Sequence, residues 1–252
     1  MLLHPTLSQL DQLGLAGMAK AFKDLADNPE AKTLDHAEWL GLLLDREATE
    51  RQDRRLKSRL RNARLRYSQA CVEDIDFTKN RGLDRRLITD LAAGHWLREH
   101  HSLLLVGACG CGKTWLSCAL GQKAARLEFS VLYHRLPKLF ADLALARDDG
   151  RYPRLFRSLC RAQLLILDDW GPEPMTTPQR RDLLEILEDR YGRASTLVTS
   201  QIPIEPWYDI IAEPTMADAI LDRLVHNAHK ITLKGESMRK RNAENLDDNT
   251  ND

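Results

Sequence analysis

The sequence has no long apolar run, little cysteine and no net charge, and the absences narrow the class of protein. Its longest apolar runs are LLLV at 103–106 and LLIL at 164–167, whereas a membrane-spanning helix needs about 20 apolar residues. The opening MLLHPTLSQLDQLGL lacks the charged segment and the continuous apolar stretch of a signal peptide. We therefore expect a cytoplasmic protein with no membrane partner.

Cysteine is scarce and follows no pattern. The five cysteines are an odd number and include no CxxC pair, so the sequence predicts no disulfide framework and indicates a reducing compartment. Cys109 and Cys111 fall in a Gly-rich loop that has no His or Cys cluster beside it in the sequence. We interpret them as loop residues that offer backbone N–H groups rather than as metal ligands.

Although the net charge is zero, positive charge is concentrated in one segment. Residues 46–66 contain nine Lys or Arg against three acids, which leaves +6. Such a segment is either a solvated helix face or a surface that binds DNA phosphates regardless of sequence. Its candidate DNA-binding residues are Arg51, Arg54, Arg55, Lys57 and Arg59. A second basic cluster comprises Lys138, Arg147, Arg151, Arg154 and Arg157.

The chain divides into a helical amino-terminal part and an α/β part. Apolar residues recur at helical spacing over 4–44, and a highly charged helix continues over 45–66. After residue 80, short apolar runs alternate with helices, which is typical of a parallel sheet covered on both faces. We predict a helical domain at 1–68, an α/β domain at 69–241 and an acidic, disordered tail at 242–252.

The α/β pattern is regular enough to place individual elements. The predicted strands are 102–106, 130–134, 164–169, 195–200 and 230–233. The predicted helices are 85–100, 113–126, 136–147, 153–162 and 177–192, with two short helices before the last strand.

Residues 107–114 read GACGCGKT and match the phosphate-binding pattern G-x-x-x-x-G-K-[ST]. Glycine lets the backbone approach a phosphate closely, and the N–H groups of the loop and of the following helix point at the same anion. We predict that Lys113 reaches the β- and γ-phosphates and that Thr114 ligates Mg²⁺. The predicted nucleotide-binding residues are Gly107, Ala108, Cys109, Gly110, Cys111, Gly112, Lys113 and Thr114.

Two further strands end in polar residues at the same predicted sheet edge. LLILDD ends in Asp168 and Asp169, and the next strand ends at Ser200 and Gln201. Ligands bind outside the carboxyl ends of strands in open α/β sheets. We assign Asp168 to Mg²⁺ and Asp169 to the attacking water, while Gln201 or Ser200 contacts the γ-phosphate or that water. An ordinary loop amide is the alternative for Gln201.

Together these motifs resemble the IstB family, ATP-dependent helper proteins of bacterial insertion-sequence transposition. The resemblance rests on the phosphate loop, DDWG at 168–171, TSQ at 199–201, ADAILDRLVH at 217–226 and KITLKGESMR at 230–239, and it covers essentially the whole chain. The family is related to DnaC helicase loaders within the DnaA-like branch of AAA+ proteins. The resemblance therefore implies an AAA+ fold, ATP and Mg²⁺ as cofactors, duplex DNA and a transposase as partners, and a homo-oligomer.

The resemblance also implies roles for single residues. Gln201 occupies the sensor 1 position, Arg223 matches an arginine finger that acts on the ATP of a neighbouring subunit, and Arg239 matches sensor 2. For both arginines, the alternative is an ordinary surface ion pair. Most AAA+ ATPases have Asp-Glu where this chain has Asp168-Asp169, so we expect slow hydrolysis. Because only residues 234–252 follow the last strand, we expect the AAA+ helical lid to be absent or vestigial.

The sequence supports one committed function and two rivals. The committed function is an ATP-dependent regulator of transposition that assembles on duplex DNA, remodels it and recruits or activates a transposase. A DnaC-like replicative helicase loader is the nearest rival, because the ATPase core alone does not separate the two. A P-loop kinase or small-molecule NTPase is more distant, since it leaves the basic helix and the arginine that acts in trans unexplained.

Overall fold

The computed structural model describes residues 5–78 and 81–235, and the chain forms two compact units, Met1–Ser58 and Arg59–Asp252. The predicted acidic tail at 242–252 and Arg239 lie outside the described residues, as does most of the segment on which the prediction about the lid depends. Among the described helices, none combines the length and the apolar character needed to cross a membrane.

The first unit is helical. It contains α1 (Pro5–Gln12), α2 (Ala16–Ala26), the 3-10 helix η1 (Pro29–Thr33) and most of the long helix α3 (His36–Ala63). Glu47 of α3 accepts hydrogen bonds from the backbone N–H groups of Gly17 at 2.7 Å and Met18 at 3.1 Å, which caps the amino end of α2. Gly17 permits this approach, because a Cβ there would lie 2.6 Å from the Cα of Glu47.

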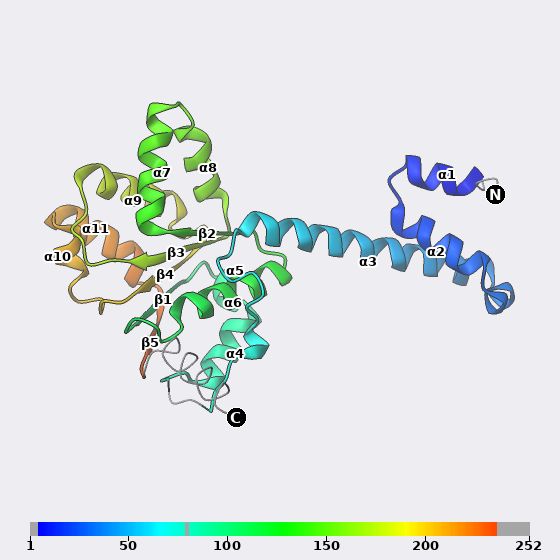
Figure 1. The fold of residues 1–252 in the computed structure, drawn as a ribbon, viewed down its shortest axis with the longest axis horizontal. Helices are drawn as coiled ribbons and strands as arrows, with labels where there is room; N and C mark the ends of the chain where they lie inside the picture. Colours follow the sequence, from blue (N-terminus) through cyan, green and yellow to red (C-terminus); the bar gives the residue numbers. More distant parts are fainter. Residues whose placement is uncertain (1–4, 79–80, 236–252) are drawn as a thin grey trace, which may run out of the picture. The chain divides into compact units, whose positions relative to one another are not determined.

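The second unit is built around a five-stranded sheet in which the order is β2-β3-β4-β1-β5 and all neighbouring strands are parallel (Figure 1). The strands are β1 (Ser102–Gly107), β2 (Val131–Arg135), β3 (Leu164–Trp170), β4 (Ser195–Ser200) and β5 (Ala228–Leu233). Each lies at or within a few residues of its predicted position, so the predicted parallel sheet is confirmed.

Helices cover both faces of the sheet (Figure 1). One face carries α4 (Arg85–Ala93), α5 (His95–Arg98) and α6 (Lys113–Arg126), and the short η2 (Val72–Asp74) contacts α6. The other face carries α7 (Leu136–Asp148), α8 (Tyr152–Arg161), α9 (Thr177–Arg190), α10 (Trp207–Ile211) and α11 (Pro214–Val225). Burial of both faces explains why the strands are nearly continuous apolar runs.

The single helix predicted at 85–100 is wrong in one respect. Gly94 adopts a left-handed conformation with φ 77°, and it separates α4 from α5. Glycine readily adopts this conformation, which commonly ends a helix. Helical periodicity continues through Gly94 because α5 buries Trp96 and Leu97, so the apolar pattern alone did not show the break.

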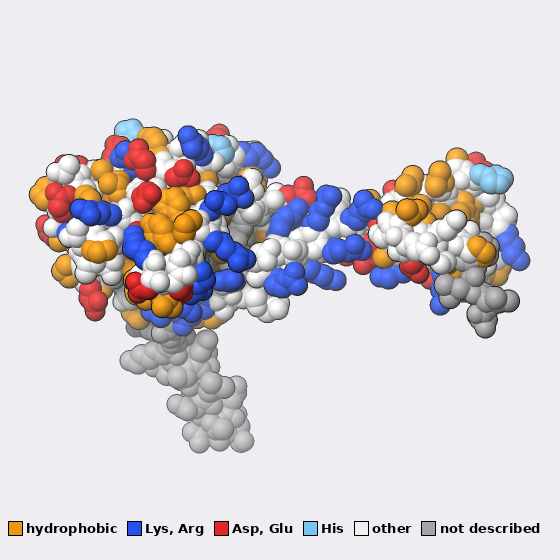
Figure 2. All heavy atoms as spheres, turned by 90° about the horizontal axis from the view of Figure 1, so that it is seen from above, with side chains coloured by type: hydrophobic (Ala, Val, Ile, Leu, Met, Phe, Trp, Pro, Cys, Tyr) orange, Lys and Arg blue, Asp and Glu red, His pale blue; other side chains and the backbone are white. Residues whose placement is uncertain are grey.

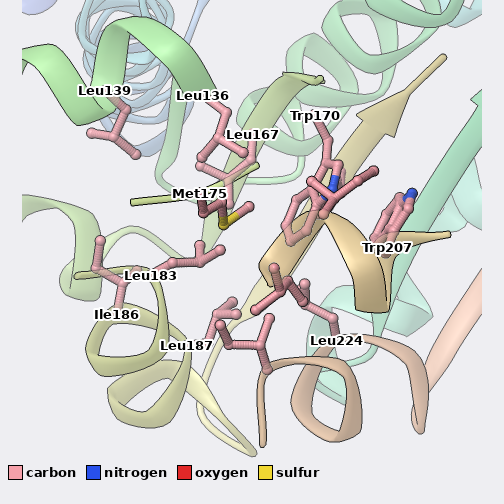
Figure 3. Packing of buried hydrophobic residues seen from close by; sticks show 14 of the residues in the cluster. Leu136, Leu139, Leu167, Trp170, Met175, Leu183, Ile186, Leu187, Trp207 and Leu224 are labelled. Atoms are coloured by element: carbon pink, nitrogen blue, oxygen red, sulfur yellow. The ribbon is translucent and has the colours of Figure 1, made fainter. Parts of the chain in front are cut away.

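The main core lies between the sheet and the α7–α11 layer. Figure 3 shows Leu136 and Leu139 of α7 and Leu183 and Ile186 of α9 facing the cluster that contains Leu167 of β3. At the end of β3, the buried Trp170 stacks on Trp207 of α10, with ring centroids 4.4 Å apart and an interplanar angle of 16°. This aromatic pair fixes the end of β3 immediately after Asp168 and Asp169.

A buried arginine holds the opposite end of the sheet. Arg190 is 1% exposed, and its guanidinium donates to the carbonyl oxygens of Leu159 at 2.7 Å, Ala162 at 2.6 Å and Ser195. Burial lowers the pKa of Arg190 to about 10. The bonds join the ends of α8 and α9 to the start of β4, on the side of the sheet remote from the phosphate loop.

Candidate functional site

The loop between β1 and α6 has the backbone geometry of a phosphate cradle. Gly110 and Gly112 adopt positive φ values of 83° and 97°, which glycine reaches without a steric penalty. α6 begins at Lys113 directly after the loop, so its N–H groups and the positive end of its dipole face the loop. Lys113 is 7% exposed, and its Nζ donates to the carbonyl oxygens of Gly107 and Ala108, both at 2.7 Å.

Asp168 lies beside this loop and accepts hydrogen bonds from three hydroxyl groups. Thr114 of α6 donates to Oδ1 at 2.9 Å, Thr199 of β4 donates to Oδ1 at 2.6 Å, and Tyr133 of β2 donates to Oδ2 at 2.7 Å. Asp168 is 1% exposed. Burial, followed by the bond to Asp168, raises the pKa of Tyr133, so this phenol remains a donor. Four elements therefore fix one carboxylate beside the Thr114 hydroxyl.

Asp169 is held differently from its neighbour. Its φ is 69°, a left-handed conformation that is uncommon for a residue other than glycine, and its N–H donates to Thr199 Oγ1 at 3.0 Å. Arg135 Nη2 lies 2.5 Å from Asp169 Oδ2, and Gln201 Nε2 donates to Oδ1 at 3.3 Å. The Arg135 hydrogen bond is the main reason that the pKa of Asp169 lies below its usual value.

These groups line one pocket of about 670 Å³, a volume within the range of small-molecule sites. The lining includes Gly112, Lys113, Thr114, Asp168, Asp169, Gln201, Arg135 and Arg66. The Thr114 hydroxyl and the Asp168 carboxylate are hard oxygen donors of the kind that Mg²⁺ prefers. The residues present thus fit a nucleoside triphosphate with its cation.

Sequence reasoning missed two arginines of this pocket and one residue beside it. Arg135 lies at the carboxyl end of β2 and lines the pocket, so the strand-end rule, applied to β2, would have found it. Tyr133 of the same strand contacts Asp168 from outside the lining. No feature of the sequence pattern indicated Arg66.

The sequence profile of the IstB-like ATP binding proteins matches residues 8–245 of the chain. The chain belongs to the IstB-like ATP-binding family. A Sinorhizobium fredii protein named as an insertion sequence ATP-binding protein is 60% identical over 240 residues, which cover 95% of this chain and 98% of that protein. The family resemblance inferred from the motifs is therefore confirmed, and nucleotide binding follows from family membership.

Solved structures show the same fold in more distant proteins. The crystal structure of the DnaC helicase loader matches with a TM-score of 0.54 and 19% identity, covering 67% of this chain and 99% of that one. AMPPCP-bound DnaA from Aquifex aeolicus matches with a TM-score of 0.54 and 17% identity, covering 71% of this chain and 55% of that one. These similarities show that this IstB-like protein has the AAA+ fold of the DnaC and DnaA group.

Arg223 of the IstB-like chain lies on α11 and outside the phosphate pocket as lined by the described residues. It forms an ion pair with Glu188 of α9, and its Nη1 donates to the carbonyl oxygen of Ala219 at 2.9 Å. Thus the structure brings Lys113 and Gln201 together in one pocket but leaves Arg223 elsewhere in the same unit.

The predicted DNA-binding residues fall into two groups. Four are engaged within the protein: Arg51 pairs with Glu47, Arg59 with Glu128, Arg147 with Asp182, and Arg151 with Asp149. The other predicted residues are exposed and have no carboxylate within ion-pair distance in residues 5–78 and 81–235; they are Arg54, Arg55, Lys57, Lys138, Arg154 and Arg157. Figure 2 shows the Lys and Arg side chains gathered along α3.

Arg147 is the clearest structural case in the engaged group. Its Nη1 donates to Asp182 Oδ2 at 2.9 Å, and Asp182 is 2% exposed. The guanidinium also lies 4.4 Å from the centre of the Tyr152 ring, whose hydroxyl donates to the same aspartate at 2.9 Å. An arginine that neutralises a buried carboxylate is poorly available to a DNA phosphate.

Proposed function

We propose that this family member is an ATP-dependent DNA-binding regulator of transposition that hydrolyses ATP slowly. The observation that carries the proposal is the pocket in which the phosphate loop, Asp168, Asp169 and Gln201 converge. Each group corresponds to a part needed for phosphoryl transfer, namely a phosphate cradle, a cation site, a group for the attacking water and a polar group for the terminal phosphate.

The residues divide the chemistry among themselves. Lys113 binds the β- and γ-phosphates, while Thr114 and Asp168 hold Mg²⁺, which when bound neutralises charge on the phosphates. Asp169 accepts the proton of the attacking water or orients it. Gln201, already hydrogen-bonded to Asp169, would lie beside that water and the γ-phosphate.

Two features of Asp169 support slow hydrolysis. Its side chain is one methylene shorter than the glutamate found in most AAA+ ATPases. It is also tied to Arg135, and a carboxylate with a lowered pKa is a weaker base. Such a site suits a switch, in which ATP binding assembles a complex and hydrolysis dissolves it.

We infer that Arg223 completes the site of a neighbouring subunit in a homo-oligomer. An arginine fork suits phosphate oxygens, and a finger supplied in trans can raise the rate about 10³–10⁵-fold. Arg223 now contacts Glu188, which is exposed, so assembly would exchange an exposed carboxylate partner for a phosphate. The Glu188 side chain is 59% exposed, so water can replace Arg223 as its partner after assembly.

DNA binding is assigned to the unpaired basic residues of α3. Positive side chains without internal partners can release counterions from duplex DNA of any sequence. The proposed partners are therefore duplex DNA and, because relatives belong to insertion sequences, a transposase encoded with this protein. Such a protein would act in the bacterial cytoplasm.

Two substitutions test whether nucleotide controls assembly on DNA. Lys113→Ala should abolish ATP binding and ATP-dependent DNA complexes, whereas Asp169→Asn should bind ATP, turn it over slowly and give longer-lived complexes. Nucleotide titration, phosphate release and electron microscopy with a duplex measure these three properties. Arg86→Ala, at an exposed arginine of α4 that does not line the pocket, is a matched surface control. If Lys113→Ala keeps wild-type ATP affinity, the proposed site is wrong.

The alternative of a replicative helicase loader rests on the DnaC-like fold. A fold shared at 19% identity does not carry the partner with it. A pull-down of the full chain against a transposase and a replicative helicase decides between them. Capture of the helicase alone would refute the role in transposition.

A further inference from the structure

The turn that ends α3 brings an arginine to the phosphate pocket. α3 ends at Ala63, and Arg64 then adopts φ 53°, a left-handed conformation that ends the helix. Ala63 is 0% exposed and Leu65 is 9% exposed, so buried side chains anchor the turn on both sides of Arg64. The following residue, Arg66, is exposed and lines the pocket.

Contacts with α6 fix the backbone at Arg66. Leu65 packs against Gly121 of α6, where an added Cβ would lie 3.1 Å from Leu65 Cδ2 and 2.8 Å from Ile166 Cδ1. Gly121 lies two helical turns beyond Thr114, on the same face of α6.

Arg66 lines the same pocket as the groups that we assign to the phosphates and to Mg²⁺. It shares the lining with Lys113, Thr114 and Asp168. Of these, Thr114 and Asp168 are the groups that we assign to Mg²⁺, and Lys113 is the group that we assign to the phosphates.

Arg66 has no ion-pair partner in the described part of the chain, although four aspartates line the same pocket. Its guanidinium lies 5.8 Å from the centre of the Tyr67 ring. By contrast, Arg135 in the same pocket pairs with Asp169. A planar guanidinium with unused donors is well suited to phosphate oxygens.

We propose that Arg66 binds the terminal phosphate of ATP and makes the end of α3 a sensor that distinguishes ATP from ADP. The proposal rests on the assignment of the pocket to ATP. When Arg66 contacts the γ-phosphate, the turn at 64–67 is tied to the nucleotide as well as to α6. α3 is one continuous helix up to Ala63. A change in the turn between the ATP-bound and ADP-bound states would therefore alter the carboxyl end of the helix that carries Arg54 and Arg55.

The test compares an ATP analogue that resists hydrolysis with ADP. Titrations use full-length wild-type protein, Arg66→Ala, Arg66→Lys and the matched control Arg61→Ala, which loses an exposed arginine of α3. Loss of one charge-assisted contact should weaken the analogue about tenfold or more in Arg66→Ala, and should change ADP affinity by less than about twofold. The affinity of Arg66→Lys for the analogue should lie between those of the wild type and Arg66→Ala, because lysine supplies the charge without the planar guanidinium.

Hydrogen exchange gives a second readout that a merely structural arginine would not change. The analogue should slow exchange at residues 65–68 in the wild type more than ADP does, and this difference should vanish in Arg66→Ala. Equal losses of ATP-analogue and ADP affinity would overturn the sensor, as would unchanged affinities in Arg66→Ala. If the wild type binds neither nucleotide, the pocket assignment itself fails, so the two failures are distinguishable.

Discussion

DNA affinity should depend on the unpaired arginines of α3 and not on the paired ones. Replacing Arg54, Arg55 and Lys57 with Ala removes three charges that have no ion-pair partner among the described residues. Alanine has the highest helix propensity, so α3 itself should persist. The effect on affinity should therefore come from lost phosphate contacts rather than from unfolding.

The expected size follows from counterion release. Each lost phosphate contact flattens the slope of log affinity against log salt by about 0.9, so three contacts change it by about 2.7. Between 50 and 200 mM salt, the wild type should then lose roughly 40-fold more affinity than the triple variant does. Fluorescence anisotropy with two unrelated duplexes measures both slopes, and the loss should be similar on each.

Arg59→Ala is the matched control on the same helix. It removes one positive charge, but Arg59 Nη2 lies 3.0 Å from Glu128 Oε1 and the Arg59 side chain is 21% exposed. The salt slope of Arg59→Ala should therefore differ from that of the wild type by well under about 0.9, the value for one lost phosphate contact. If the triple variant keeps the wild-type slope, α3 is a solvated face and the reasoning from unpaired charge is refuted. Lys138 and Arg154 would then be the residues to test.

Three further outcomes are expected. Arg190→Met should lower the free energy of unfolding by about 3 kcal/mol or more, measured by denaturant titration, because several buried carbonyl groups lose their donor; a loss below about 1 kcal/mol would contradict this account. The pKa of Glu47 is lowered, chiefly by its hydrogen bond with Arg51, so Glu47 stabilises the first unit above its usual pKa and loses this effect as the pH falls below about 4.5. Protection of the Gly17 amide, relative to its intrinsic exchange rate at each pH, should fall over this range in the wild type and should not fall in Glu47→Gln. Mixed Arg223→Ala and Lys113→Ala subunits should regain some ATPase activity; a mixture as inactive as its folded, associating components would show that Arg223 does not act in trans.

The parts of this protein that could be predicted from its sequence are those that depend on residues close together in the chain. Parallel strands were predictable because buried strands are continuous apolar runs, and the convergence of Asp168, Asp169 and Gln201 followed from the shared carboxyl edge of such strands. Lys113 and Thr114 were predictable because one contiguous motif contains both the loop and the start of α6.

What could not be predicted depends on partners far apart in sequence. Arg147 is 35 residues from Asp182, and a basic cluster read from composition does not reveal which of its members neutralise buried acids. Arg190 is the last residue of α9, where a charged side chain is ordinarily exposed, yet it is buried among carbonyl groups. Similarly, the role of Arg66 depends on the left-handed turn at Arg64, for which the sequence has no glycine signal.

Gly107 has a consequence for how the protein should be inactivated in experiments. Its φ is 149°, and a Cβ there would lie 2.2 Å from the carbonyl oxygen of Leu233 at the end of β5. Even an alanine would push the edge strand away from β1. A variant of this glycine would lose activity through a displaced strand and would be mistaken for a protein that cannot bind nucleotide. Lys113 is the safer position for an inactive control, because shortening its side chain leaves the pairing of β1 with β5 intact.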